Sequence, residues 1–315
     1  MRAAYVRRPG QADEIHVGEL PDPVPAEGAV LVDVAVSAVD PVDTFVRSGL
    51  FAVPGPWPLV LGRDFAGRVA QDGGGFTAGE PVWGNSLGHG GRQGAAATRV
   101  AVAADRLYRL PDGADPAEFV AMVHPAATAF LALYPHGRLQ AGETVLVAGG
   151  GGNVGSALIE LASNAGARVV ATASARDLAH CRALGAAEAL DYHDAELPDD
   201  IDVYVDTSGT NDLAAVVPRM AWRGRIVLLA GPHSRPVLPA GELYMHDRTV
   251  VGFAISHATA GELAAAAKTL NERFSTGGLR PRAVERLALT EAAEAHRRIE
   301  RGETHGRRLV LDVAV

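Results

Sequence analysis

Cysteine and lysine are almost absent from this chain of 315 residues, which has Cys181 as its single cysteine and Lys268 as its single lysine. One cysteine excludes an intramolecular disulfide and any zinc site built from several cysteines. Because Cys181 falls in a predicted helix, we interpret it as a small buried hydrophobic residue. No histidine falls in an H-E-x-x-H pattern, so a metalloprotease site of that type is excluded as well.

Long apolar runs and clusters of basic residues are also missing. We find no run of about 18 apolar residues that would span a bilayer, and the N-terminal segment has no apolar signal region. The formal net charge is -8 and there is no long basic stripe, which argues against binding to nucleic acid or to a membrane surface. We expect a cytoplasmic protein, whose 48% hydrophobic content is enough for a sizeable core.

Residues 1–110 have the pattern of a β-rich domain. Short segments rich in β-branched residues, such as Ala29–Val36, alternate with proline and glycine turns. Near residue 116 the pattern changes to helix, although Pro125 interrupts the segment Ala117–Leu133. The sequence therefore predicts a compact β-domain or partial barrel that is followed by a different domain.

From residue 144 onward, strands and helices alternate. The predicted strands are Thr144–Ala148, Arg168–Thr172, Glu188–Asp191, Asp202–Asp206, Arg225–Leu229 and Thr249–Ala254. Between the first two, Val154, Leu158 and Leu161 have helical spacing. This alternation predicts a parallel sheet, and six strands fit a doubly wound nucleotide-binding domain of the Rossmann type. The predicted fold class is therefore α/β.

A glycine-rich turn follows the first of these strands. Gly150, Gly152 and Gly155 fit G-x-G-x-x-G, in which the first glycine permits a tight turn, the second admits a pyrophosphate and the third lets helix and strand pack closely. The helix N-terminus then offers free N–H groups to the phosphates. Because the turn joins a predicted strand to a predicted helix, we predict dinucleotide binding. A purely structural glycine-rich turn is the alternative.

The end of the second strand indicates which dinucleotide binds. An NAD site usually has an acidic residue there, which bonds the ribose 2′-hydroxyl. Here Ser174 takes that position and Arg176 follows, and a hydroxyl with a guanidinium suits a 2′-phosphate. We therefore predict NADPH. The nearby Asp177 argues against this choice, and Arg176 in a merely solvated loop is the alternative.

Two other patterns have competing interpretations. Gly84-Asn-Ser-Leu-Gly88 fits the G-x-S-x-G of hydrolases, but the glycine-rich segment after it cannot form the helix that this pattern requires. His124 precedes Pro125 at the predicted domain junction, where it could line a cleft or serve only in packing.

Several segments taken together are specific to one family. They are Asp40–Gly49, Gly62–Gly67, the glycine turn, Asp191-Tyr192 and Arg308–Val313. On these segments the chain resembles, over nearly its whole length, the zinc-independent quinone oxidoreductases (the zeta-crystallin-like branch) of the medium-chain dehydrogenase/reductase superfamily. The resemblance implies a GroES-like catalytic domain of residues 1–122 and 258–315, into which an NADPH-binding domain of residues 123–257 is inserted. It also implies a homodimer joined near residues 247–252.

The resemblance further assigns cofactor contacts, residue by residue. It implies that Gly152, Asn153 and Val154 hold the pyrophosphate, and that Ser174, Arg176 and Tyr192 hold the 2′-phosphate. It also implies that Thr128 faces the nicotinamide and that Phe253 and Ile255 flank it. Arg308 is expected to close the cofactor cleft.

Two positions depart from the family. Asn is usual where this chain has Asp40, and an ionised aspartate cannot donate a hydrogen bond as the amide does. If burial raises the pKa of Asp40, this residue could instead be a proton donor. Tyr is frequent where the chain has Phe51. The polar candidates for catalysis are Asp40, Arg47, Arg63 and Thr128, and for the two arginines a structural ion pair with a nearby aspartate is the alternative.

Zinc alcohol dehydrogenases of the same superfamily use a cysteine, a His-Glu pair and a four-cysteine lobe. In this chain the position of that cysteine falls near Ser37–Asp40, and Arg63-Asp64 stands where the His-Glu pair would be. The four-cysteine lobe is missing, so we predict no metal. Without a Lewis acid an alkoxide is not stabilised, whereas reduction of a conjugated carbonyl is still feasible. We predict an NADPH-dependent, metal-free oxidoreductase that transfers hydride to a quinone or an α,β-unsaturated carbonyl. The alternatives are an enoyl reductase that tailors a polyketide-type substrate, and an NADPH-binding structural or regulatory protein without turnover.

Overall fold

The computed structural model describes residues 1–52 and 54–313, and the chain divides into two units. The first unit consists of Met1–His124 and Thr259–Val315, and the second of Pro125–Ala258. The boundaries predicted from the sequence, after residues 122 and 257, lie within two residues of these. The first unit is therefore discontinuous in sequence, and the second is inserted into it.

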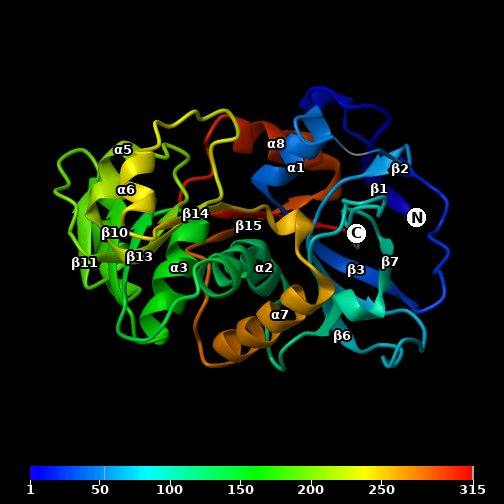
Figure 1. Cartoon of the computed structure of the whole chain (residues 1–315). Coiled ribbons are helices and arrows are strands. Elements are labelled where there is room, and N and C mark those ends of the chain that lie inside the picture. The colour runs from blue at the N-terminus through cyan, green and yellow to red at the C-terminus, as the bar shows by residue number, and fades with distance from the viewer. Residues whose placement is uncertain (53, 314–315) are drawn as a thin grey trace. The chain divides into compact units, whose positions relative to one another are not determined.

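A six-stranded parallel sheet forms the centre of the second unit (Figure 1). The strand order is β11-β10-β9-β12-β13-β14. The strands are β9 (Thr144–Ala148), β10 (Arg168–Ala173), β11 (Glu188–Asp191), β12 (Ile201–Asp206), β13 (Met220–Leu228) and β14 (Thr249–Gly252). All six predicted strands are confirmed, and so is the doubly wound fold. The chain winds outward in both directions from the neighbours β9 and β12, and sheets of this kind bind ligands at the carboxyl ends of the strands at that point.

The helices of the second unit follow the strands in the chain. They are α3 (Asn153–Asn164), α4 (Leu178–Ala183), α5 (Leu213–Val216) and α6 (Ala240–Tyr244). Helix α3 packs against β9 and β10, and it buries Leu158, Ile159 and Leu161. Their spacing places these side chains on one face of the helix, which explains why the apolar pattern predicts it.

Helix α2 (Pro116–Leu131) continues through Pro125, so the predicted interruption is wrong. The segment Pro116–His136, which adds a π-helical turn, is long and apolar enough to cross a membrane, but 83% of its most apolar stretch is buried inside the protein. A proline within a helix costs about 3 kcal/mol, and tertiary packing of an apolar segment overrides such local preferences. The boundary between the two units falls at this proline.

Two sheets build the first unit (Figure 1). The three-stranded sheet has the order β2-β1-β4, with β1 (Arg2–Val6), β2 (His16–Glu19) and β4 (Leu59–Val60). The seven-stranded sheet has the order β15-β16-β3-β5-β6-β8, and β7 pairs with β3. Its strands are β3 (Ala29–Val39), β5 (Phe65–Val69), β6 (Pro81–Gly84), β7 (Arg99–Ala103), β8 (Leu107–Arg109), β15 (Val284–Ala288) and β16 (Arg308–Asp312).

The C-terminal segment completes the larger sheet. Strand β16 runs antiparallel to β3, with Leu309 opposite Val39 and Leu311 opposite Ser37. Val32, Val34 and Phe65 form a buried core together with Leu309 and Leu311. The β-domain predicted from residues 1–110 therefore lacks part of its core until the end of the chain has been added.

Three longer helices belong to the first unit. They are α1 (Pro41–Ser48), α7 (Ala260–Ser275) and α8 (Ala292–Glu300). Helix α1 begins directly after β3, where the Asp43 carboxylate accepts a hydrogen bond of 2.8 Å from the Asp40 backbone N–H. Gly49, with φ of 87°, ends the helix in the left-handed conformation that glycine adopts without strain. This short helix therefore holds Asp40 at a defined position between β3 and α1.

Candidate functional site

The glycine turn lies between β9 and α3, as predicted. Its first residue, Gly149, has a φ of 84°, and the N–H groups of Gly149 and Gly150 donate to the Thr172 carbonyl over 3.0 and 2.9 Å. These two bonds attach the turn to the end of β10. Asn153 and Val154, two of the predicted pyrophosphate contacts, form the first turn of α3, where backbone N–H groups have no partner within the helix.

The three glycines of the pattern differ in what surrounds them. A Cβ atom on Gly155 would lie 2.1 Å from the Gly149 carbonyl oxygen, and one on Gly150 would lie 2.9 Å from the Ala171 Cβ atom. A Cβ atom on Gly152 would meet only the Gly149 oxygen, at 3.4 Å. Packing within the protein therefore requires glycine at the first and third positions. At Gly152, which is exposed, the open space fits a group that approaches the backbone from outside, as a pyrophosphate does.

The three residues predicted to hold a 2′-phosphate follow the ends of β10 and β11. The Tyr192 N–H donates to the Ala173 carbonyl over 3.1 Å, which brings Tyr192 next to Ser174. The Arg176 side chain is 69% exposed. The structure thus brings a hydroxyl, a phenol and an accessible guanidinium to one edge of the sheet.

Asp177 lies beneath this edge. Its carboxylate accepts a hydrogen bond of 2.6 Å from the Ser174 hydroxyl, and it would lie 2.6 Å from a Cβ atom on Gly151. Asp177 is only 3% exposed. The acid that argues against NADPH is therefore buried against the glycine turn, whereas the guanidinium of Arg176 is exposed.

The remaining predicted cofactor contacts in the second unit lie on three elements. Thr128 lies on α2 and is 7% exposed. Phe253 follows β14 and stacks on His136, with ring centroids 4.4 Å apart, and Ile255 is buried two residues later. Rings in this arrangement hold the Phe253 side chain in place.

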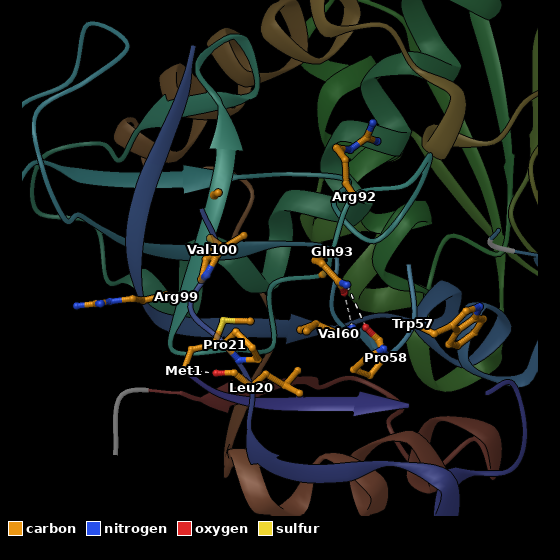
Figure 2. A pocket seen from close by; sticks show the side chains of 13 residues that line it. Met1, Leu20, Pro21, Trp57, Pro58, Val60, Arg92, Gln93, Arg99 and Val100 are labelled. Atoms are coloured by element: carbon orange, nitrogen blue, oxygen red, sulfur yellow. Dashed lines mark hydrogen bonds between the residues drawn. The ribbon is translucent and has the colours of Figure 1, made fainter. Parts of the chain in front are cut away.

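A pocket of about 320 Å³ lies in the first unit (Figure 2). The Gln93 side chain crosses one wall, where its oxygen accepts from the Val60 N–H over 2.6 Å and its amide donates to the Pro58 carbonyl over 3.0 Å. The wall is largely apolar, and it includes Leu20, Pro21 and Trp57. None of the predicted catalytic residues lines this pocket, so we place the chemistry elsewhere.

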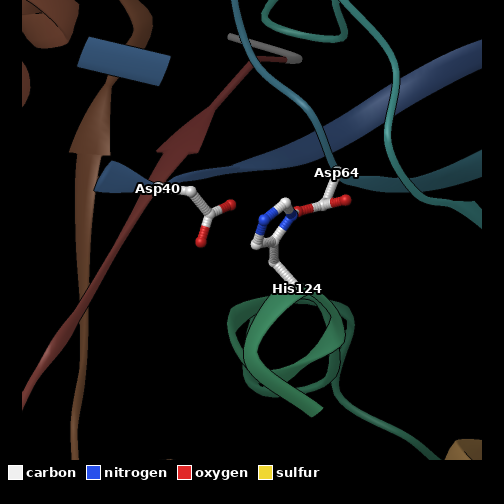
Figure 3. A group of neighbouring side chains, drawn as sticks. All are labelled: Asp40, Asp64 and His124. Atoms are coloured by element: carbon white, nitrogen blue, oxygen red, sulfur yellow. The ribbon is translucent and has the colours of Figure 1, made fainter. Parts of the chain in front are cut away.

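A cluster of buried charged side chains lies in the first unit, and Asp40, Asp64 and His124 form its centre (Figure 3). The His124 ring lies between the two carboxylates, with Nδ1 3.0 Å from Asp64 Oδ2. The other Asp64 oxygen, Oδ1, accepts from the Ser86 backbone N–H over 3.0 Å. Ser86 belongs to the G-x-S-x-G pattern, and no helix follows it, so the hydrolase interpretation fails.

Arg308 belongs to the same cluster. Its Nη2 donates to Asp40 Oδ1 over 2.5 Å, and its Nε donates to the Ala121 carbonyl over 2.7 Å. Arg308 is only 4% exposed. Arg308 is predicted to close the cofactor cleft, and in this structure its guanidinium binds a carboxylate and a carbonyl of its own unit.

The condition under which Asp40 could be a proton donor, a raised pKa, is not met. Burial by itself raises the pKa of Asp40, but the nearby Arg308 guanidinium and the His124 ring outweigh burial and lower it to about 2. Asp40 is therefore ionised at neutral pH. Burial likewise lowers the pKa of His124, whereas Asp64 and Asp40 raise it more strongly, so the net direction is upward. Burial and Asp40 raise the pKa of Asp43 to about 7, and burial also raises the pKa of Asp64 above its usual value.

The two other predicted catalytic arginines have different environments. Arg47 is fully buried, its Nη1 donates to the Gly10 carbonyl over 2.8 Å, and its Nη2 pairs with Glu300 of α8. It therefore serves the packing of α1 on α8, through a glutamate and not through the aspartate that the sequence suggested. Arg63 is 1% exposed, donates to the Leu87 carbonyl over 3.1 Å and adds positive charge beside the buried carboxylates.

The donor atoms of Asp40, Asp64 and His124 lie within 4.8 Å of one another, a spacing that could suit a metal ion. These groups are already engaged, however, because Asp40 binds Arg308 and Asp64 binds both His124 and the Ser86 N–H. The guanidinium groups of Arg63 and Arg308 also disfavour a second positive charge. The contacts therefore favour an internally paired cluster. The sequence pattern gives Asp64 no catalytic role, and the one signal for His124 in the sequence is its place beside the predicted domain junction.

Comparison with known proteins agrees with this architecture. Residues 26–112 match the alcohol dehydrogenase GroES-like domain, and residues 153–272 match the zinc-binding dehydrogenase domain. The chain is 26% identical to human quinone oxidoreductase, over 99% of this chain and 97% of that protein. It is 34% identical to the chloroplastic NADPH-dependent alkenal/one oxidoreductase of Arabidopsis thaliana, over 67% of this chain and 57% of that protein.

Solved structures show the same similarity. A mycobacterial protein in complex with NADPH superposes with a TM-score of 0.82 at 26% identity, over 99% of both chains. An NAD-dependent alcohol dehydrogenase superposes with a TM-score of 0.87 at 28% identity, over the whole of both chains. The chain therefore belongs to the medium-chain dehydrogenase/reductase superfamily. Within it, the chain is similar to the quinone oxidoreductases, and it is an oxidoreductase enzyme.

The glycine turn generates a paired prediction. Gly152→Ala leaves the fold intact, within about 0.5 kcal/mol of unfolding free energy, because the added methyl group has room. It nevertheless raises the Kd for NADPH and NADH at least ~10-fold, because the methyl group occupies the space for the pyrophosphate. Gly155→Ala destabilises the protein by about 1–3 kcal/mol or more, because its methyl group overlaps backbone. Thermal unfolding and fluorescence titration measure these effects. Unchanged nucleotide affinity in the Gly152 variant would show that the turn is only structural.

Proposed function

We propose that this enzyme is an NADPH-dependent, metal-free reductase of quinones or α,β-unsaturated carbonyls. One observation carries the proposal. The residues that take the zinc-ligand positions of the related alcohol dehydrogenases, Asp40 and the Arg63-Asp64 pair, belong here to an internally paired charge cluster. Such a cluster offers no Lewis acid to stabilise an alkoxide, and an acceptor with a conjugated carbonyl needs none. The names of the human and Arabidopsis relatives support the same acceptors.

The residues of the second unit fit NADPH. The exposed backbone at Gly152 and the first turn of α3 would hold the pyrophosphate, while Ser174, Arg176 and Tyr192 would hold the 2′-phosphate. When bound, NADPH supplies the hydride that the acceptor takes up. Thr128, Phe253 and Ile255 would orient the nicotinamide, since two of them are buried and Phe253 is fixed by His136. None of these three side chains carries a charge.

The choice of NADPH over NADH depends on which charge is accessible. Asp177 is buried and accepts from Ser174, so it presents no free carboxylate to a ribose 2′-hydroxyl. Arg176 is exposed, and its Nε lies 4.0 Å from the Asp177 carboxylate, so its guanidinium is available for a strong charge-assisted bond. The solved relative in complex with NADPH supports this choice, whereas the NAD-dependent relative makes a direct test necessary.

Steady-state oxidation of NADPH with a panel of acceptors tests the proposed function. We expect turnover with a quinone and with an enone, no turnover with the matching saturated ketone, and no loss of activity after treatment with a chelator. Preference for an enoyl thioester over a free enone would favour the polyketide-type enoyl reductase. Tight NADPH binding without turnover on any acceptor would favour the regulatory alternative and contradict the proposal.

Arg176→Ala tests the cofactor choice. Removing one charge-assisted contact to the 2′-phosphate costs about 1.5–3 kcal/mol, so the Kd for NADPH rises ~10–100-fold. The Kd for NADH changes less than ~2-fold, because NADH lacks the phosphate. Arg168→Ala is the matched control, since Arg168 is also an exposed arginine and begins the same strand, β10, at the opposite edge of the sheet. Equal losses for both cofactors would show that Arg176 does not recognise the phosphate.

We also propose a homodimer joined at β14. This strand is an edge of the six-stranded sheet, and exposed apolar side chains lie on the neighbouring segments: Trp222 is 61%, Tyr244 73% and Met245 61% exposed. An open edge beside exposed apolar groups suits self-association. We expect light scattering to give twice the mass of one chain, and the double substitution Tyr244→Asp, Met245→Asp to give a monomer. A monomeric wild type would refute the dimer.

A further inference from the structure

The loop that follows β12 begins beside the glycine turn. Asp206, the last residue of β12, pairs with Ala148, the last residue of β9, so Thr207 stands where these two central strands end. The chain winds outward in both directions from this pair of strands, and sheets of this kind bind ligands at the carboxyl ends of the strands there. Residues 207–212 therefore lie at the edge where a cofactor is expected, although the predicted cofactor contacts do not include them.

The carboxylate of Asp206 fixes the path of this loop. Asp206 is fully buried, and its Oδ1 accepts from the Ser208 N–H over 2.7 Å, the Ser208 hydroxyl over 2.7 Å and the Gly209 N–H over 3.0 Å. Its Oδ2 accepts from the Asn211 N–H over 2.6 Å and from the Tyr204 hydroxyl over 3.3 Å. A different path of the loop would leave a buried carboxylate without these partners, which is costly.

The same loop is joined to the segment that follows β13. The Asn211 Nδ2 donates to the Ser234 hydroxyl oxygen over 2.6 Å and to the Ala230 carbonyl over 3.1 Å. Gly209 and Gly231 approach so closely that a Cβ atom on Gly209 would lie 2.8 Å from the Gly231 nitrogen. The loop is therefore held from two neighbouring strands of the sheet.

Thr207 connects this fixed loop to the glycine turn. Its N–H donates to the Ala148 carbonyl over 3.0 Å, and its hydroxyl lies 2.7 Å from the Ala148 carbonyl oxygen and 3.2 Å from that of Gly149. One hydroxyl proton serves both oxygens, at the point where β9 passes into the turn. A Cβ atom on Gly149 would lie 2.5 Å from Thr207 Oγ1. This glycine, which precedes the G-x-G-x-x-G pattern, therefore makes room for the hydroxyl.

The Gly149 carbonyl lies between Thr207 and the expected position of the pyrophosphate. It accepts from the Gly152 N–H over 3.0 Å, and a Cβ atom on Gly155 would lie 2.1 Å from its oxygen. The N–H of Gly149 donates to the Thr172 carbonyl, so β10 holds this residue by its N–H while Thr207 holds it by its carbonyl. A displaced Gly149 carbonyl would therefore displace Gly152, beside which the open space fits a pyrophosphate.

We propose that Thr207, held in place by Asp206, is a positioning residue for the dinucleotide, a role that rests on the proposed function. Its hydroxyl keeps the Gly149 carbonyl, and through it the Gly152 backbone, in the arrangement that receives the pyrophosphate. Without the hydroxyl the turn is ordered only when the nucleotide binds, and this cost lowers the affinity. Because NADPH and NADH share the pyrophosphate, both lose affinity equally, in contrast to the selective loss in Arg176→Ala.

Thr207→Val tests this role, because it replaces the hydroxyl with a methyl group of similar size. We expect the Kd for NADPH and the Kd for NADH to rise by the same factor of ~3–10, the effect of one hydrogen bond. The KM for NADPH rises in the same ratio, whereas kcat at saturating NADPH falls less. Thr207→Ser keeps the hydroxyl and brings both Kd values back to within ~2-fold of the wild type. Fluorescence titration and steady-state kinetics measure these effects. A serine variant that binds as weakly as the valine variant would overturn the proposal.

Thr210→Val is the matched control. Thr210 belongs to the same loop and its side chain is exposed, while its backbone N–H donates to the Ser208 hydroxyl over 3.1 Å. We expect both Kd values to stay within ~2-fold of the wild type. A loss equal to that in Thr207→Val would show that the affinity responds to any change in this loop, and would overturn the proposal.

Combining Thr207→Val with Gly152→Ala tests whether the threonine acts through the turn. Gly152→Ala already fills the space beside the turn, so adding Thr207→Val to it raises the Kd for NADPH by less than ~2-fold, as expected for coupled sites. If the two losses of binding free energy add in full, Thr207 does not act through Gly152 and the proposal is wrong.

Titration of the wild type with both nucleotides separates failure of this proposal from failure of the proposed function. A wild type that binds neither NADPH nor NADH refutes the proposed function together with the role of Thr207. A wild type that binds them but reduces no conjugated acceptor refutes the proposed function alone, since the role of Thr207 is measured by affinity. Unchanged Kd values in Thr207→Val refute only the role of Thr207.

Discussion

The buried ion pair between Asp40 and Arg308 is the interaction on which the first unit depends. It joins residues 268 positions apart, and the Arg308 Nε also binds the Ala121 carbonyl of α2. The end of β3, the C-terminal strand β16 and helix α2 therefore meet at one guanidinium. Removing one partner of a buried pair costs about 3–5 kcal/mol, because the other charge is left without compensation. The same contact completes the large sheet, since it fixes β16 where it pairs with β3.

This ion pair also sets the chemistry of the cluster. Arg308 keeps Asp40 ionised, and ionised Asp40 together with Asp64 favours a charged His124 ring. The asparagine that is usual at position 40 in the family would leave Arg308 without a counter-charge, so the aspartate and the arginine depend on each other. The departure from the family pattern is therefore a change of electrostatics: an amide that donates a hydrogen bond is replaced by an anion that raises the pKa of a neighbouring histidine.

The second unit shows how one glycine pattern combines two requirements. Gly150 and Gly155 are needed because a Cβ atom there would overlap neighbouring atoms, whereas the space at Gly152 is open toward solvent. The first and third glycines thus build the turn, and the second admits the ligand. Asp177 could be taken from the sequence for an accessible acid. In the structure it is buried beneath the turn, and its carboxylate accepts a hydrogen bond from the Ser174 hydroxyl.

Local patterns in the sequence determined the elements of the second unit: the six strands after residue 144 and the glycine turn follow from spacing between near neighbours in the chain, whereas the insertion of this unit was implied by the family resemblance. The continuation of α2 through Pro125 could not be predicted from the local pattern, because burial of the helix overrides the local preference of proline. Only the tertiary structure decided which charges meet. Asp40 pairs with Arg308, Asp64 with His124 and Arg47 with Glu300, and these partners are 268, 60 and 253 residues apart. Protonation depends on distance and burial in space, and neither can be deduced from the order of residues along the chain.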